Sequence, residues 1–220
     1  TITDACLNAT TATQTFEIDD NIAPVITGTI PTTPVAGCSV SDIPAAVTTV
    51  AALEALGLNI SDNCTIDANL VVTSSDAAPT GTCPISIVRT YTITDACDNF
   101  ETVEQTFEID DNINPEISCP VTGTQTVIVN TGDTYTHNAP PNWNATATDN
   151  CPGTVTLEAQ LSGVTTTGPH TTLNGVTFNQ GLTHVTWTAT DECGNTDECF
   201  FDVQVDGEAD IEVVKTGPAT

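Results

Sequence analysis

The chain has 220 residues, of which two are basic and 29 are acidic, giving a formal net charge of −27. A surface with so few cations cannot neutralise phosphate groups, which excludes nucleic acid as a partner and argues against anionic membranes. No apolar stretch approaches the roughly 20 residues of a membrane-spanning helix, so we expect no direct membrane insertion, while the 39% of apolar residues suffices for folded cores.

A sequence repeat organises the chain. TITDACLNATTATQTFEIDDNIAP begins at Thr1 and recurs as TITDACDNFETVEQTFEIDDNINP from Thr92, with a period of 91 residues. A weaker third copy, TATDECGNTDECFFDVQVD, begins at Thr188. The predicted domains are therefore the C-terminal strands of a truncated repeat (1–20), a complete repeat (21–111), a divergent repeat (112–207), and a linker with the start of a further β module (208–220). Since no signal peptide opens the sequence, we expect a piece of a longer protein.

Most predicted elements are short strands, because apolar and polar residues alternate with period two. In chain order these strands are 15–19, 85–94, 125–130, 184–190 and 200–205. The exception is TTVAALEALG (48–57), whose Ala and Leu content and terminal Gly57 predict one short inserted helix. Short strands separated by turn residues are typical of β-sandwiches, so the expected fold class is all-β. Arg89 falls on the apolar face of its strand, where we expect its stem to pack and its head to meet a carboxylate at the sandwich edge.

Nine cysteines, many of them beside Asp, Asn or Gly in turn-like sequence, favour an oxidising, extracellular compartment and a disulfide framework. The spacing of structural zinc ligands is missing. Cys64 in SDNC and Cys151 in TDNC hold matching positions in their repeats, and each is expected to pair with the later cysteine of TDxC. The predicted pairs are Cys64–Cys97, Cys151–Cys193, Cys119–Cys199 and Cys38–Cys83. Cys6 would then pair with a cysteine further upstream.

Acidic residues gather where the repeats join, in the sequence EIDDN at 17–21 and 108–112. Carboxylates so placed repel one another, and a hard cation such as calcium would remove that repulsion. The candidate ligands are Asp4, Asp19, Asp20, Asn21, Asp95, Asp110, Asp111, Asn112, Asp191 and Asp206. Solvated turn residues are the alternative interpretation, and the sequence leaves both open because it has no EF-hand or nonapeptide calcium loop.

The sequence contains no recognisable catalytic motif. His137, His170 and His184 are isolated, and GxSxG, HExxH and phosphate-loop sequences are absent. The acidic turns repeat with the domain period, whereas a glycosidase carboxylate pair occurs once. We therefore expect no enzymatic activity. Trp143 and Trp187 could together form a sugar-stacking surface, although Trp187 alternates with apolar neighbours and is expected in a core.

The last repeat resembles a known extracellular module. Its ISCP, PPNWNATATDNCPG and FNQGLTHVTWTATDECGNTDECFFDVQVD segments resemble the hyalin repeat, an immunoglobulin-like domain, over most of residues 115–206. The preceding repeat is similar through SDNC, YTITDACDN and FEIDD, but it has the extra helix and lacks a cysteine matching Cys199. This resemblance implies tandem immunoglobulin-like β-sandwiches, arranged end to end as a rod.

Arrays of such modules are similar to the giant cell-surface adhesins of gliding Bacteroidota, of the SprB type, which the type IX system secretes. The resemblance implies a structural shaft segment of a large extracellular adhesin or filament for surface attachment or gliding motility. Its partners would be neighbouring repeats of the same chain and an unknown surface or glycan ligand. The alternative is a stalk or carbohydrate-binding segment of a secreted multidomain enzyme, and carbohydrate binding predicts an exposed Trp143.

Overall fold

The computed structural model describes residues 1–17, 19–130, 132–138 and 140–208. The expected start of a further β module at 208–220 therefore lies almost wholly outside the described residues. Contacts divide the chain into two units. Unit 1 comprises Thr1–Thr33, Ile43–Pro79 and Ser86–Glu108, and unit 2 comprises Pro34–Asp42, Thr80–Ile85 and the chain from Ile109 onward. Strands dominate both units, which confirms the all-β fold class.

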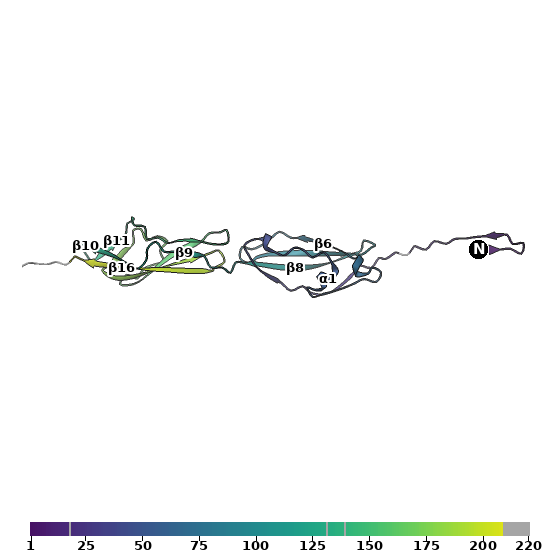
Figure 1. The fold of residues 1–220 in the computed structure, drawn as a ribbon, viewed down its shortest axis with the longest axis horizontal. Helices are drawn as coiled ribbons and strands as arrows, with labels where there is room; N and C mark the ends of the chain where they lie inside the picture. Colours follow the sequence, from purple (N-terminus) through teal and green to yellow (C-terminus); the bar gives the residue numbers. More distant parts are fainter. Residues whose placement is uncertain (18, 131, 139, 209–220) are drawn as a thin grey trace, which may run out of the picture. The chain divides into compact units, whose positions relative to one another are not determined.

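The first sheets contain the regular strands of residues 1–110. A four-stranded sheet has the order β4-β8-β7-β6, and β3 pairs with β5 in a second, two-stranded sheet (Figure 1). The strands are β3 (Val25–Gly28), β4 (Thr33–Ala36), β5 (Leu58–Ser61), β6 (Val71–Asp76), β7 (Ile85–Thr94) and β8 (Phe100–Asp110). A small hairpin of β1 (Ile2–Thr3) and β2 (Ala9–Thr10) precedes them, and short 3-10 helices lie at Val40–Asp42 and Asp67–Asn69. Buried residues of β5, β6 and β7 form one core with Leu53 of the helix.

The predicted helix is present but shorter than expected. Helix α1 spans Val50–Glu54, and the Thr49 side chain caps it by accepting a hydrogen bond from the Ala52 N–H at 3.3 Å. Gly57 adopts a φ of 112°, a conformation that favours glycine, and the chain turns there into β5. Val50 and Leu53 are buried, so the helix packs its apolar side into the core.

The predicted strand at 15–19 is wrong for the described residues of that segment. Thr15, Phe16, Glu17 and Asp19 form no strand, and Phe16 is 75% exposed. The same pentapeptide, TFEID, recurs at 106–110 inside β8, where Phe107 is only 1% exposed. The difference lies in the neighbours, because β8 has β4 and β7 beside it and a strand needs a hydrogen-bonded partner.

A second four-stranded sheet lies wholly in unit 2, in the order β10-β16-β15-β13, together with two small antiparallel pairs, β9 with β12 and β11 with β14 (Figure 1). Along the chain, β10 is the first strand of this four-stranded sheet and β16 is the last. The two lie parallel, with Thr124 opposite Asp202 and Val129 opposite Gly207. The strands are β9 (Glu116–Ser118), β10 (Thr124–Val129), β11 (Thr134–Thr136), β12 (Thr146–Thr148), β13 (Thr156–Gly163), β14 (Thr177–Asn179), β15 (Gly181–Thr190) and β16 (Thr196–Gly207).

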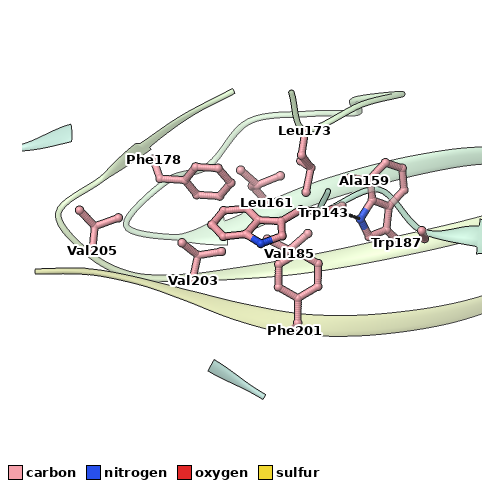
Figure 2. Packing of buried hydrophobic residues seen from close by; sticks show 11 residues of the cluster. Trp143, Ala159, Leu161, Leu173, Phe178, Val185, Trp187, Phe201, Val203 and Val205 are labelled. Carbon is pink, nitrogen blue, oxygen red and sulfur yellow. Dashed lines mark hydrogen bonds between the residues drawn. The ribbon is translucent and has the colours of Figure 1, made fainter. Parts of the chain in front are cut away.

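The core of unit 2 is built around two tryptophans (Figure 2). Trp187 is fully buried, as expected, and its indole N–H donates to the Trp143 carbonyl at 3.1 Å. Trp143 is only 2% exposed, and its ring meets Phe178 edge-on with 5.7 Å between centroids. His137 stacks flat on the Trp143 ring, with centroids 3.9 Å apart. Trp143 therefore forms no exposed platform, and the interpretation of a sugar-binding surface around it is wrong.

Arg89 makes the contacts that its place in the sequence predicts. Its side chain is 6% exposed, and its guanidinium donates to both carboxylate oxygens of Asp76, at 2.7 and 3.0 Å. A third hydrogen bond reaches the Pro44 carbonyl at 2.8 Å, and the guanidinium lies over the Phe107 ring, 5.1 Å from its centroid. The hydrogen bond from Arg89 holds the pKa of Asp76 below its ordinary value of 3.8.

We expect removal of the Asp76 carboxylate to lower the free energy of unfolding more than removal of the Arg89 guanidinium does. Asp76→Ala leaves a buried guanidinium without its carboxylate and should lower the free energy of unfolding of unit 1 by about 3 kcal/mol. Arg89→Met should cost about 1 kcal/mol, because the Asp76 side chain is 37% exposed and can be hydrated. Urea unfolding followed by circular dichroism measures both losses. An equal or larger loss for Arg89→Met would contradict this assignment. Since the pKa of Asp76 is lowered on folding, the contribution is present above pH 4 and is lost as the pH falls further.

Candidate functional site

Two groups of acidic side chains have the same construction, one in each unit. Site 1 consists of Asp20, Asp62, Asn63, Asp95 and Asn99, and site 2 consists of Asp111, Asp149, Asn150, Asp191 and Asn195. Carboxylate oxygens of Asp20, Asp62 and Asp95 lie within 4.8 Å of one another, and those of Asp111 and Asp149 do so in site 2. The 91-residue period relates Asp20 to Asp111, so the sites are two copies of one design.

A turn anchored by an aspartate closes each site on one side. One oxygen of Asp95 accepts the backbone N–H groups of Cys97 and Asn99 at 2.8 and 2.9 Å, and its other oxygen accepts the Asn99 side-chain amide at 2.7 Å. Asp191 makes the equivalent three bonds to Cys193 and Asn195, each at 2.8 Å. The hydrogen bonds, first among them that from the Asn99 side chain, hold the pKa of Asp95 below its ordinary value. Both turns therefore keep a charged carboxylate at the site.

Asparagine side chains link this turn to the junction segment, which is the EIDDN sequence that contains Asp20 in site 1 and Asp111 in site 2. Asn99 donates to the Asp20 carbonyl at 3.0 Å, as Asn195 does to the Asp111 carbonyl at 2.9 Å. A second asparagine in each site donates to the side chain of that same junction aspartate at 3.3 Å: Asn63 in site 1 and Asn150 in site 2. These shared bonds show that the matching geometry extends beyond the sequence motif.

Several carboxylate oxygens of the two sites are buried and have no hydrogen-bond partner among the described residues. They are Asp20 Oδ2, Asp62 Oδ2 and Asp149 Oδ1. Asp95 and Asp111 are themselves 4% and 7% exposed. A buried charged oxygen without a donor is costly, and it is a ligand that hard cations prefer. The donor set of carboxylate, amide and carbonyl oxygens therefore fits calcium.

Four of the predicted cation ligands lie in the two sites: Asp20 and Asp95 in site 1, and Asp111 and Asp191 in site 2. The structure also adds Asp62 and Asp149, which sequence reasoning missed, although their place in the two DNC motifs was a usable signal. The other candidates lie outside both sites and are exposed: Asp4, Asp19, Asn21, Asp110, Asn112 and Asp206. Asp4 caps its own exposed turn by accepting the Cys6 N–H, and Asp206 accepts a hydrogen bond from Gln204.

Three disulfides are present, and only Cys119–Cys199 matches a predicted pair. The structure joins Cys38 to Cys151 and Cys83 to Cys193, each with 5.2 Å between Cα atoms. The predicted pairs Cys38–Cys83, Cys64–Cys97 and Cys151–Cys193 are therefore wrong, and Cys6, Cys64 and Cys97 are free and exposed. The physical reason is that the segments 34–42 and 80–85 belong to unit 2, where each places its cysteine against one of the two turns.

The two disulfides lie beside site 2. The four cysteines of the Cys38–Cys151 and Cys83–Cys193 bonds line a cavity of about 50 Å³, together with Asp111, Asp149 and Asp191. The Asn150 amide, which contacts Asp111, also lies 3.6 Å from Cys38 Sγ. The segments that carry Cys38 and Cys83 thus cover the acidic site, and the sulfur bridges fix that cover in place.

Comparisons with known proteins found solved structures of low sequence identity. No curated protein matches the sequence. Mouse cadherin-23 EC22-24 is a similar solved structure, with 13% identity, a TM-score of 0.34 and coverage of 83% of this chain and 66% of that one. Human mucin-like protocadherin EC1-2 has 8% identity, a TM-score of 0.33 and coverage of 83% and 98%. Protocadherin gamma B2 domains 3-6 has 11% identity, a TM-score of 0.37 and coverage of 87% and 55%.

The family comparison concerns unit 2. Its tryptophan core, the Cys119–Cys199 bond and the acidic turn before Cys193 all fall in one stretch of sequence. The disulfides fit an extracellular protein. Within the described residues, no helix has the length and apolar character needed to cross a membrane. Residues 110–205 match the family model of the HYR domain, in agreement with the resemblance of this repeat to the hyalin repeat.

Proposed function

We propose that the chain is a structural, non-catalytic shaft segment of a large extracellular repeat adhesin or filament. The observation that carries the proposal is the HYR match over residues 110–205, in a chain whose other unit has the same acidic turn. HYR modules are extracellular, and a protein built from repeated units suits a role in spanning distance outside the cell. Neighbouring repeats of the same chain are its nearest partners.

The finer assignment is to a cell-surface adhesin of the SprB type, secreted by the type IX system and used in attachment or gliding over a surface. Its support is the mixture of near-identical Thr-rich and Asp-rich repeats in one chain. The adhesive ligand is a surface or glycan that other parts of the protein contact, since the two tryptophan rings of unit 2, Trp143 and Trp187, are buried.

Structural roles for the histidines support a function without catalysis. His137 is buried against Trp143, and this burial lowers its pKa. His170 contacts Thr167 and forms a bridge with Ala159, which holds a loop beside β13. His184 pairs with Asp202 on the neighbouring strand, on an exposed face.

Deletion of residues 21–207 in the full-length protein, in its own cells, tests the adhesive role. We expect the shortened protein to reach the cell surface, as scored with an antibody to a retained region, and attachment to glass or gliding to decrease. Replacement by an unrelated β-sandwich pair of equal length is the matched control, and it should restore function if the segment acts as a spacer. Unchanged attachment after the deletion would refute the shaft role, and hydrolysis of a glycan by the purified protein would refute its non-catalytic character.

Calcium is the cofactor that we propose for sites 1 and 2. When bound, it would neutralise the clustered carboxylates and satisfy the buried oxygens of Asp20, Asp62 and Asp149. The residues of this chain would hold it with aspartate and asparagine oxygens from the junction segment and from two turns of one unit. Such a site stiffens the segments that it joins, in keeping with a structural role.

Calcium at 10 mM is expected to stabilise each unit by about 2 kcal/mol over chelated protein, for a dissociation constant of about 0.1–1 mM. The corresponding increase in Tm is on the order of 10 °C. Asp62→Asn should remove the response of unit 1, and Asp149→Asn that of unit 2. Asparagine retains the carbonyl oxygen that accepts from the Cys64 or Cys151 N–H. Asp19→Asn, an exposed predicted ligand outside both sites, is the control. The proposal would be refuted if calorimetry detected no heat of calcium binding and if the Tm were the same in calcium and in chelator.

A further inference from the structure

We propose that Cys64 and Cys97 of unit 1 are the receiving half of a two-disulfide clamp. In unit 2 the equivalent cysteines, Cys151 and Cys193, each bond a cysteine from a separate short segment. We infer that Cys64 and Cys97 do the same with two cysteines supplied by another repeat of this protein. This inference does not depend on the adhesive role.

The backbone holds the two pairs of cysteines in the same way. The Cys64 N–H donates to Asp62 at 3.0 Å, and the Cys151 N–H donates to Asp149 at 3.0 Å. The second cysteine of each pair lies in the aspartate-anchored turn of its site, with N–H to carboxylate distances of 2.8 Å in both units. Since sites 1 and 2 also share their asparagine contacts, Cys64 and Cys97 are placed by the same framework as their bonded counterparts.

Only the partner differs between the two units. Cys151 and Cys193 are half-buried and bonded, whereas Cys64 and Cys97 are exposed and free. Cys151 and Cys193 are not bonded to each other, so the shared framework argues against a Cys64–Cys97 bond as well. Free, exposed thiols are seldom kept in an oxidising compartment, and two of them at bonded positions indicate a missing partner.

Unit 2 shows the chemistry that this partner must have. Its first segment has the pattern Gly-Cys-x-x-x-Asp, in which Asp42 accepts the N–H groups of Cys38 and Ser39 at 2.8 and 2.9 Å. Gly37 donates its N–H to the Asp110 carbonyl at 3.2 Å, and a Cβ on Gly37 would lie 2.6 Å from the Asp42 carboxylate. The second segment is a Cys-Pro pair, Cys83 and Pro84. In unit 1, the 91-residue period puts the Asp19 carbonyl in the place of Asp110 as the acceptor.

This chain holds one such pair of segments, and its cysteines are already bonded. Unit 2 offers no second pair, because the sequence has no cysteine between Cys119 and Cys151 or between Cys151 and Cys193. The occupant is therefore a Gly-Cys-x-x-x-Asp segment and a Cys-Pro segment from another repeat. Each new bond removes two thiol protons and two electrons. The disulfide of an extracellular thiol oxidoreductase accepts the electrons and becomes a dithiol.

Disulfide mapping of the full-length protein from its source tests the inference. Free thiols are blocked with iodoacetamide without reduction, the protein is cut at acidic residues, and bonded peptides are identified by mass spectrometry. We expect Cys64 and Cys97 to be unalkylated and joined to two different peptides, one with each pattern, while Cys38–Cys151 and Cys83–Cys193 appear in the same digest. Alkylated Cys64 and Cys97, a Cys64–Cys97 bond, a bond between two copies of Cys64, or a glutathione adduct would each overturn it.

Single serine variants of the full-length protein give a second readout by counting thiols with a maleimide after mild denaturation. Cys64→Ser is expected to raise the count by one over wild type, because it frees the partner cysteine. Cys151→Ser is the matched control and should also raise the count by one, through Cys38. If Cys64 has no partner, Cys64→Ser lowers the count by one, which refutes the proposal even if the variant is less stable.

Discussion

The double variant Cys119→Ser/Cys199→Ser is expected to lose about 4 kcal/mol of unfolding free energy in unit 2. The bond links the end of β9 to β16 across a sequence separation of 80 residues, so it restricts most of the unfolded chain of this unit. Both cysteines also pack against the tryptophan core, and Cys199 lies opposite Trp187. Serine in either place exchanges apolar contact for a hydroxyl.

Urea unfolding followed by tryptophan fluorescence measures this loss selectively, because the only two tryptophans of the chain, Trp143 and Trp187, lie in unit 2. Cys6→Ser serves as the control, since Cys6 is free and exposed and its replacement should change the midpoint by less than the error. A loss below 1 kcal/mol for the double variant would mean that the bond does not constrain the unfolded chain as inferred.

Trp187→Ala is expected to cost about 4 kcal/mol in unit 2. The side chain is fully buried in the core, so its removal leaves a large cavity (Figure 2). The Trp143 carbonyl oxygen also loses the hydrogen bond that it accepts from the Trp187 indole N–H at 3.1 Å. Trp187→Phe should cost less, because most of the ring volume remains.

The loss is measured by urea unfolding, with the fluorescence of Trp143 as the remaining probe. Ile128→Ala is a suitable control, because Ile128 lies in the same sheet but is 65% exposed, and its replacement should change the free energy of unfolding by less than about 0.5 kcal/mol. Equal effects of the two alanine variants would show that Trp187 does not organise the core.

The sequence predicts elements well where local pattern and tertiary environment agree. Alternation over 85–94 corresponds to β7, and the Ala-rich stretch with Gly57 corresponds to α1. Alternation fails at the described residues 15–17 and 19, because the TFEID sequence makes a strand at 106–110, where β4 and β7 lie beside it. A pattern of period two shows that a segment is able to pair, and the presence of a partner decides whether it does.

The candidate sites could be predicted only in part. The EIDDN and TDxC motifs identify Asp20, Asp95 and their counterparts, but Asp62 and Asp149 are distant in sequence, and only the folded unit brings them close. Pairing the cysteines by position gives the wrong disulfides for a related reason. It treats each repeat as closed on itself, whereas Cys38 and Cys83 belong by contact to unit 2. The sequence period shows which positions of two repeats are equivalent, but it does not show which residues lie close together in the folded protein.

The Cys119–Cys199 bond also determines how unit 2 responds to pulling. While this bond is intact, Cys119 and Cys199 stay one bridge apart, so pulling on the chain ahead of β9 and at the end of β16 cannot draw out the residues between them. The 80-residue separation corresponds to about 270 Å of extended chain, which stays out of reach while the sulfur–sulfur bond is intact. Reduction would release that reserve, so the redox state of the surroundings sets how far the protein can stretch before it breaks.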